Sequence, residues 1–456
     1  MRGGLLVSIA LLAISCSGRG DREEVVLMTL DPGHFHAALV QKVQYPGVSR
    51  DVYVYAPEGP DLEQHLSRIE SYNTRPEDPT QWNEVVYRGD DFLDRMLSEK
   101  KGNVMVTSGN NALKTDYILR SLEAGINVLA DKPMAIDADN FALLEECFET
   151  AGKKGVLLYD IMTERFEIST ILQRELSMIP SIYGEQLEGS PEDPAVTKES
   201  VHHFYKNVSG NALVRPAWFY DVSQQGEGIA DVMVHLVDLV QWECFPGQAI
   251  DYRKDIVIGS ARHWTTPVSR EQFKESTGLD SFPDFLQKDV KDRVLQVYAN
   301  GEIGYEIKGV HAKISVSWAF EPPEGGGDTH YSVMRGTRSN LVIRQGADQG
   351  YIPELYIEPS VQLEGLDEAF ATLAAKYPGI ALEPFGEGWH VVIPDSYRVG
   401  HEAHFGQVTE NFLEYLSEGS LPDWEVPCMV SKYYTTTQAL QIARGMGNDQ
   451  TLTLCQ

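Results

Sequence analysis

The first 162 residues alternate short apolar runs with segments of helical spacing, and this alternation limits the possible folds more than any other feature. Apolar runs lie at residues 24–30, 51–57, 102–108, 126–131 and 156–162. The helical segment at 113–125 ends in Gly125, a residue suited to a helix C-cap. Runs without a polar face are typical of strands buried on both sides. The pattern predicts an α/β fold, with a Rossmann-like, doubly wound parallel sheet over residues 25–162.

The second half of the chain has a different pattern. After about residue 251, long runs alternate apolar and polar residues, which indicates an antiparallel sheet with one face in water. Helical spacing appears at 165–179, 228–244, 404–419 and 431–447. Residues 345–400 read as irregular, apart from a helix near 365–377 and an alternating, strand-like run at 388–394. We therefore predict a second domain over residues 163–456, of α+β class, built on a large, open, mainly antiparallel sheet.

The N-terminus has the form of a targeting segment. Arg2 precedes an apolar run from Leu5 to Ile14, and Cys16 follows. The run is too short to cross a bilayer as a helix. It resembles a bacterial lipoprotein signal peptide over residues 1–16, followed by a polar tether at 17–24. The resemblance implies lipidation of Cys16 and an exported protein, held by its lipid anchor on the periplasmic or outer-membrane face. An ordinary secretory signal with an incidental cysteine is the alternative.

Charge and cysteine content exclude two classes of function. The 38 basic and 67 acidic residues give a net charge of −29, which would repel a nucleic-acid backbone. The cysteines outside the signal segment are scattered and form no C-x-x-C pair, so a zinc site of that kind is not indicated. In an exported protein Cys428 could pair with Cys455.

Candidate ligand-binding residues follow three of the predicted strands. In doubly wound sheets, ligands bind at the carboxyl ends of the strands, where residues 31–36, 107–111 and 130–133 fall. The first turn has Asp31, Gly33 and His36 at the three glycine positions of a dinucleotide fingerprint, so only the middle glycine is present. His34 and His36 could contact phosphate, or could simply begin a helix.

Two further patterns indicate acid–base chemistry. Lys132 lies at the mouth of the sheet, and the following proline restricts its backbone; a surface lysine paired to Asp131 is the alternative. Asp231 and His235 are four residues apart and would share one helix face. A carboxylate can orient an imidazole and raise its basicity, as a general base requires. The alternative is a core helix with one satisfied histidine.

These motifs resemble those of the Gfo/Idh/MocA family, named from glucose–fructose oxidoreductase and inositol dehydrogenase. The family's Glu-Lys-Pro motif appears as Asp131-Lys132-Pro133, its Asp-x-x-x-His helix as Asp231 and His235, and its usual ending as NFLEYLSEGSLPDWEV. The resemblance implies a nicotinamide enzyme acting on a sugar, polyol or related hydroxy compound. Lys132 would hydrogen-bond the reacting hydroxyl, His235 would exchange its proton, and Asp231 would orient His235.

The resemblance also implies binding residues. Those assigned to the NAD or NADP cofactor are Gly33, His34, His36, Glu58, Thr107, Gly109, Asn110, Asp131 and Pro133. Those assigned to the carbohydrate substrate are Arg215, Trp218 and Tyr220, for which ordinary packing is the alternative. Family members often pair through the open sheet, so a homo-oligomer is expected.

The leading function is NAD(P)-dependent oxidoreduction of a carbohydrate hydroxyl. Because freely exchanging NAD(H) is not expected outside the cytoplasm, one alternative is a redox-neutral enzyme that cleaves or epimerises glycosides with tightly bound NAD. A second is a carbohydrate-binding lipoprotein without a cofactor. His401 and His404 could serve a metal together with His330 or His390, but Glu402 and these histidines fit a polar helix start better, and no metal site is predicted.

Overall fold

The computed structural model describes residues 24–208 and 211–445, with side-chain positions omitted at 207–212. The predictions for the signal segment, Cys16, most of the tether and Cys455 lie outside the described residues. Cys147, Cys244 and Cys428 are free thiols. No helix within the described ranges is both long enough and apolar enough to cross a membrane.

The first domain is a six-stranded parallel sheet in the order β3-β2-β1-β4-β5-β6, which confirms the predicted doubly wound fold. Its strands are β1 (Leu27–Leu30), β2 (Asp51–Ala56), β3 (Asn83–Arg88), β4 (Val104–Thr107), β5 (Asn127–Asp131) and β6 (Leu158–Ile161). Its helices are α1 (His36–Leu39), α2 (Pro60–Thr74), α3 (Phe92–Glu99), α4 (Asn111–Glu123) and α5 (Ala138–Lys154). β1, β4 and β6 are buried along their whole length, as their apolar runs predict. β3 lies outside the predicted runs because it is a half-exposed edge strand.

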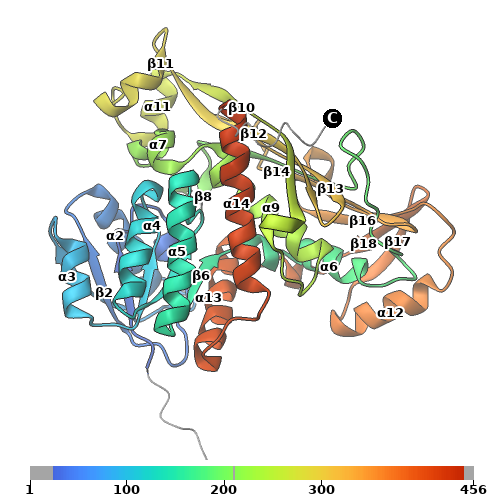
Figure 1. Ribbon diagram of the computed structural model, residues 1–456, viewed down its shortest axis with the longest axis horizontal. Coiled ribbons are helices and arrows are strands. Elements are labelled where there is room, and N and C mark those ends of the chain that lie inside the picture. The colour runs from blue at the N-terminus through green and yellow to red at the C-terminus, as the bar shows by residue number, and fades with distance from the viewer. Residues whose placement is uncertain (1–23, 209–210, 446–456) are drawn as a thin grey trace, which may run out of the picture.

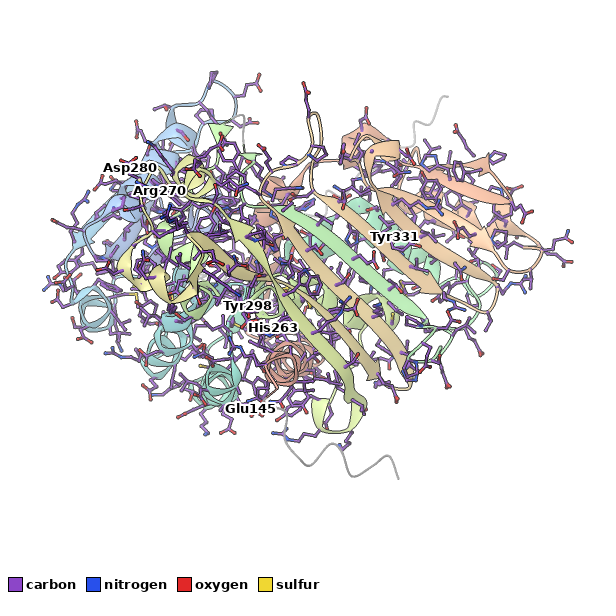
Figure 2. The ribbon with its side chains drawn as sticks, turned by 90° about the horizontal axis from the view of Figure 1, so that it is seen from above. Glu145, His263, Arg270, Asp280, Tyr298 and Tyr331 are labelled. Atoms are coloured by element: carbon purple, nitrogen blue, oxygen red, sulfur yellow. The ribbon has the colours of Figure 1, made fainter. Side chains whose placement is uncertain are left out.

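The second domain is an open ten-stranded sheet, in which β13 and β7 pair in parallel and the other pairs are antiparallel. Its strands are β7 (Val196–His203), β10 (Ile256–Val268), β11 (Val290–Lys291), β12 (Val294–Ile307), β13 (Val310–Ala319), β14 (Thr329–Arg335), β15 (Ser339–Gln345), β16 (Glu354–Pro359), β17 (Ala381–Phe385) and β18 (Gly388–Val392). The prediction of irregular structure over 345–400 is therefore wrong at β16 and β17, whereas β18 matches the alternating run predicted at 388–394. Figure 2 looks onto the sheet, with Tyr331, His263 and Tyr298 on it.

Helices pack against this sheet or join it to the first domain. They are α6 (Ile168–Ser177), α7 (Val222–Gln225), α8 (Gly228–Asp231), α9 (Met233–Cys244), α10 (Tyr252–Asp255), α11 (Arg270–Thr277), α12 (Leu366–Lys376), α13 (His401–Glu418) and α14 (Glu425–Ala443). Short 3-10 turns include η1 (Thr163–Phe166) and η2 (Ala217–Tyr220). The two last helices return to the first domain, where Phe405, Phe412 and Tyr433 join its hydrophobic core. The chain therefore crosses between the domains more than once.

A buried ionic cluster ties these crossings together. Arg165 donates to both carboxylate oxygens of Asp238 at 2.6 and 2.7 Å, and to Glu425 at 2.9 Å. The Lys432 Nζ lies 2.9 Å from Asp238 Oδ1 and 2.8 Å from Asp160 Oδ2, and Asp160 lies on β6. These side chains are almost completely buried, so each charge depends on its partners. The cluster fixes α9 and α14 against the first sheet, next to the carboxyl ends of its strands.

Candidate functional site

A cavity of about 490 Å³ lies between the carboxyl edge of the first sheet and the second domain. Residues from both domains line it, and most are polar or charged. They include His34, His36, Gly109, Asn111, Asp131, Lys132, Glu164, His202, Lys206, Arg215, Gln225, Asp231, His235, Trp318, His401 and Glu402. The cavity lies at the place where the strand order of a doubly wound sheet reverses, beside β1 and β4, as expected for a ligand site.

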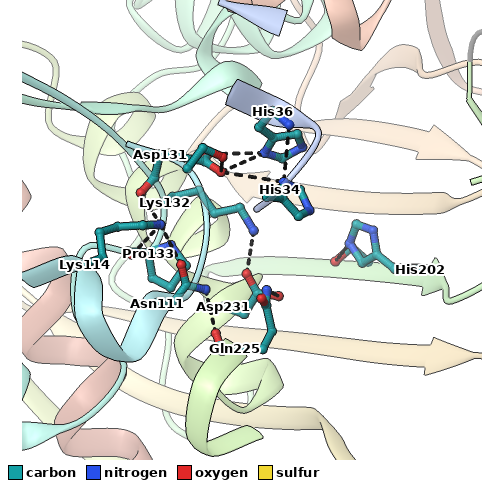
Figure 3. Close-up of polar contacts among 12 residues, drawn as sticks. His34, His36, Asn111, Lys114, Asp131, Lys132, Pro133, His202, Gln225 and Asp231 are labelled. Atoms are coloured by element: carbon teal, nitrogen blue, oxygen red, sulfur yellow. Dashed lines mark hydrogen bonds and ion pairs between the residues drawn. The ribbon is translucent and has the colours of Figure 1, made fainter. Parts of the chain in front are cut away.

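Lys132 and Asp231 form an ion pair inside this cavity (Figure 3). The Lys132 Nζ donates to Asp231 Oδ1 at 2.6 Å, and Gln225 Nε2 donates to Asp231 Oδ2 at 3.0 Å. The peptide bond between Lys132 and Pro133 is cis. Burial alone would raise the pKa of Asp231, but the Lys132 ammonium lowers it below its usual range. The pair joins β5 of the first domain to α8 of the second.

The predicted orientation of His235 by Asp231 is wrong. Both Asp231 oxygens are taken by Lys132 and Gln225. Between the two residues the helical hydrogen bonding is irregular, since the His235 N–H bonds to the Val232 carbonyl at 3.0 Å, although Val232 keeps an αR backbone. His235 still lines the cavity, and its buried Nδ1 has no hydrogen-bond partner. Burial lowers the pKa of His235 to about 3, and Lys132 contributes, so the imidazole is neutral near pH 7.

The turn after β1 brings three predicted cofactor residues together. His36 Nδ1 lies 3.0 Å from Asp131 Oδ2, and His34 Nδ1 lies 3.8 Å from the same oxygen (Figure 3). Burial lowers the pKa of both histidines. Burial would raise the pKa of Asp131, but His36 holds it below its usual range. Two neutral imidazoles therefore face one ionised carboxylate.

The outer side of the same turn is closed. The Trp218 ring lies against Gly33, where an added Cβ would be 3.1 Å from it, and its Nε1 donates to Asp61 at 2.9 Å. The Gly33 N–H is bonded to the carbonyl of Asp31 at 2.8 Å, and the His34 N–H to the carbonyl of Ser108 at 3.0 Å. In this arrangement those two backbone donors are not free to bind a diphosphate.

Other predicted cofactor residues lie around this turn in different roles. Glu58 is exposed two residues beyond the end of β2, and Thr107 is buried at the end of β4. Asn110 caps α4, since its side chain accepts from Ala112 N at 3.1 Å, and it donates to Gln224 at 2.8 Å. Gly109 lines the cavity. Their roles toward a cofactor stay predictions.

The three predicted substrate residues separate in the structure. Arg215 lines the cavity, where its guanidinium lies over the Phe219 ring at 4.2 Å. Trp218 covers Gly33 instead, and Tyr220 is buried with its hydroxyl 2.6 Å from Ser276 Oγ. Tyr220 therefore follows the packing alternative, because η2 turns it into a hydrophobic cluster of the second domain.

The structure adds cavity residues that no sequence pattern indicated. Glu164, at the start of η1, lies 3.4 Å from His401 Nδ1. Gln225 holds Asp231, and His202 projects from β7. Their neighbours in the cavity are distant in sequence, so spacing could not reveal them. Glu402 also lines the cavity and pairs with Lys42.

The C-terminal histidines do not form one group. His390 pairs with Glu354 at 2.9 Å in the second sheet, and His330 lies on β14. His401 lines the cavity, while His404 is buried without a partner for its Nδ1. Among the described residues, the group of side chains placed to share an ion does not include these histidines.

Asp31, at the first fingerprint position, should make stability depend on pH. Burial raises the pKa of Asp31 to about 6, although the hydrogen bond from Tyr117 acts in the opposite direction and lowers it. A raised pKa means that the folded state prefers the protonated form, so stability falls as the pH rises from about 4 to about 6. Asp31→Asn keeps the left-handed backbone (φ 48°) and removes the charge.

Asp31→Asn should therefore be more stable than wild type by about 1 to 2 kcal/mol at pH 8 and nearly equal to it at pH 4. Urea unfolding at the two pH values measures this difference. Asp116→Asn, at an exposed position on α4, is the control and should have no comparable effect. An equal gain for Asp31→Asn at both pH values would contradict the assignment.

Comparison with known proteins identifies relatives. The family model described as "Putative oxidoreductase C terminal domain" matches residues 172–444. A solved structure of a putative oxidoreductase from Parabacteroides merdae is 62% identical, with a TM-score of 0.90, over 93% of this chain and 98% of that one. No curated protein matches.

More distant structures share the fold. A putative myo-inositol dehydrogenase from Sinorhizobium meliloti is 13% identical, with a TM-score of 0.53, over 92% of this chain and 98% of that one. A levoglucosan dehydrogenase solved with NADH is 11% identical, with a TM-score of 0.59, over 93% of this chain and 98% of that one. Both alignments extend across the two domains.

Proposed function

Because the chain belongs to the oxidoreductase family whose C-terminal domain it carries, and has the Gfo/Idh/MocA fold, we propose that it oxidises or reduces a carbohydrate hydroxyl with NAD(P). The Lys132–Asp231 pair is the observation that carries the proposal. It places a cationic donor at the carboxyl edge of the parallel sheet, in a cavity of about 490 Å³ with polar walls. Dehydrogenases of the same fold, one of them solved with NADH, support a hydride reaction.

Lys132 is the group that handles the reacting oxygen. Its Nζ donates to Asp231, which holds the ammonium in place and leaves its other protons for a substrate oxygen. A hydrogen bond from Lys132 stabilises negative charge on that oxygen as its proton leaves or returns. His235, being neutral, can accept a hydrogen bond from a second hydroxyl. The hydrogen bond from Gln225 to Asp231 holds the Lys132–Asp231 pair in position in the cavity.

In this arrangement the cavity residues fit the nicotinamide end of a dinucleotide, and the turn after β1 does not fit its diphosphate. The reacting end fits, because Gly109, Asp131 and Lys132 line the cavity at the ends of β4 and β5. When bound, NAD(P) would supply the hydride acceptor or donor. The diphosphate turn does not fit, because Trp218 covers Gly33 and the turn's N–H groups are paired. Dinucleotide binding therefore requires Trp218 to leave Gly33.

Mass spectrometry of acid-released small molecules, together with NAD(H) and NADP(H) titration of the purified protein, tests the cofactor. Trp218→Ala removes the hydrogen bond to Asp61 that closes the turn. Such a bond is worth about 1.5 kcal/mol, so the variant should bind dinucleotide about tenfold more tightly than wild type. Trp389→Ala, on β18 at the far edge of the second sheet, is the matched control and should leave the affinity unchanged.

Absence of dinucleotide binding in both wild type and Trp218→Ala would sink the NAD(P) proposal. If binding is found, a panel of hexoses, inositols, anhydrosugars and disaccharides identifies the substrate. Net NADH formation indicates a dehydrogenase. Release of a sugar without net NADH indicates redox-neutral cleavage with a retained cofactor.

A further inference from the structure

The geometry points to a divalent transition-metal site formed by His34, His36 and Asp131 at the edge of the first sheet. We propose that these three side chains bind one ion whose open coordination positions face the cavity. The proposal goes beyond hydride transfer, because such an ion would add a Lewis acid beside the Lys132–Asp231 pair.

The three side chains already stand close to the positions of metal ligands. Their ligand atoms all lie within 4.8 Å of one another. Two ligands on one zinc ion at about 2.1 Å are roughly 3.4 Å apart. The Asp131 Oδ2 lies 3.0 Å from His36 Nδ1 and 3.8 Å from His34 Nδ1, which brackets that value. Over the described parts of the chain, no other three His, Cys, Asp or Glu side chains meet this way.

Secondary structure holds the triad in place. The two histidines flank Phe35 in the turn that joins β1 to α1, and their rings are 4.1 Å apart at 86°. Asp131 is the last residue of β5, two strands away in the sheet. Ser108 donates to Asp131 Oδ2 at 2.8 Å. Lys114 donates to the Asp131 backbone carbonyl at 2.9 Å (Figure 3). Such neighbours orient a ligating carboxylate.

The backbone N–H groups of this turn are bonded within the protein, the His36 N–H to His34 Nδ1 at 3.4 Å among them, whereas the side chains line the cavity. The N–H groups of Gly33 and His34 are bonded to protein carbonyls. The two imidazoles and the Asp131 carboxylate instead line the cavity. This turn offers imidazole nitrogen and carboxylate oxygen atoms with lone pairs in place of backbone N–H groups. Such a turn suits a cation rather than an anion.

Ligand type and number indicate the class of ion. Two histidines and one carboxylate are borderline ligands that suit zinc, iron(II), manganese, cobalt or nickel. Three protein ligands leave a position open, as in catalytic zinc sites. That position would take an oxygen of the bound molecule, such as a hydroxyl or carbonyl of a carbohydrate. Two neighbouring cations already have partners: the Lys132 ammonium pairs with Asp231 at 2.6 Å, and the Lys114 ammonium donates to the Asp131 backbone carbonyl at 2.9 Å.

Zinc binding to the full, tag-free chain tests the proposal. Metal-free protein is titrated with Zn²⁺ by calorimetry, and the retained metal is counted by elemental mass spectrometry. We expect one equivalent, bound at micromolar or lower concentration. Ser108→Ala should weaken binding about 10- to 100-fold, and His36→Gln and Asp131→Asn should weaken it more.

His202→Gln is the matched control. His202 lines the same cavity, but its Nε2 contacts Ser200 Oγ at 3.0 Å and it lies outside the triad. Its replacement should leave zinc affinity unchanged. Failure of wild type to bind zinc, cobalt or manganese at micromolar concentration would overturn the proposal. So would equal losses in His202→Gln and His36→Gln.

A spectroscopic measurement on wild type covers the case in which a variant fails to fold. Cobalt(II) in this site should show visible absorption bands typical of nitrogen and oxygen ligands, and zinc should displace it. Bands of thiolate ligation, or none, would place the metal elsewhere. Dinucleotide content of the same samples reports separately on hydride transfer, so either proposal can fail while the other stands.

Discussion

Replacement of Lys132 by methionine is expected to lower turnover by about 10²- to 10⁴-fold, the contribution typical of a positioned acid–base group. Methionine keeps the length of the side chain and removes the donor to the reacting oxygen. Because Lys132 lines the cavity and no neighbour duplicates its contact with Asp231, no other side chain should rescue the reaction. Steady-state kinetics on the substrate found by the sugar panel measures the loss.

The same change should also cost stability. Asp231 is only 6% exposed, and it would lose its counter-ion. We expect a loss of about 1 to 3 kcal/mol on unfolding. The double variant Lys132→Met/Asp231→Asn removes the stranded charge, so it should regain stability without regaining turnover. Recovery of turnover in the double variant would show that Lys132 acts only as a structural partner.

The second large effect is expected in the buried ionic cluster. Asp238→Ala leaves Arg165 and Lys432 without their shared carboxylate, in a region from which water is excluded. Removing one partner of such a group costs about 3 to 5 kcal/mol. The surrounding cations lower the pKa of Asp238, so its stabilisation is complete above the usual carboxyl range and is lost as the pH falls.

Denaturant unfolding at pH 7 measures this effect, with Glu302→Ala as the control. Glu302 makes a similar two-bond contact with Arg262, but Arg262 is exposed on the second sheet. Exposed pairs contribute less than about 1 kcal/mol. If the two variants lose equal stability, the cluster does not hold the domains together in the way that its burial implies.

The sheet of the first domain was largely predictable. β1, β4 and β6 are buried from end to end, and an apolar run records that condition directly. β3 escaped because its residues are only partly buried, so it carries no continuous apolar run. β17 escaped for the same reason, since most of its residues are exposed, and the short strand β16 was missed as well.

Individual residues of the candidate site could be predicted from the sequence, but the contacts between them could not. Lys132 and Asp231 were both assigned, each from its own motif. Their direct pairing was not, because 99 residues separate them. In the structure the partners of Asp231 are Lys132 and Gln225 and not His235. Local spacing cannot reveal a partner that the packing of the two domains brings from a distant segment.

The amino-acid sequence by itself determined the alternation of strands and helices, the acidic character of the surface and the place of the ligand site at the carboxyl edge of the first sheet. These properties depend on local composition and period. Only the tertiary structure decided that Trp218 covers Gly33, that His34 and His36 meet Asp131, and that α14 returns to the first domain. Each of these depends on contacts between distant segments, whose geometry is set by how the two sheets and their helices pack.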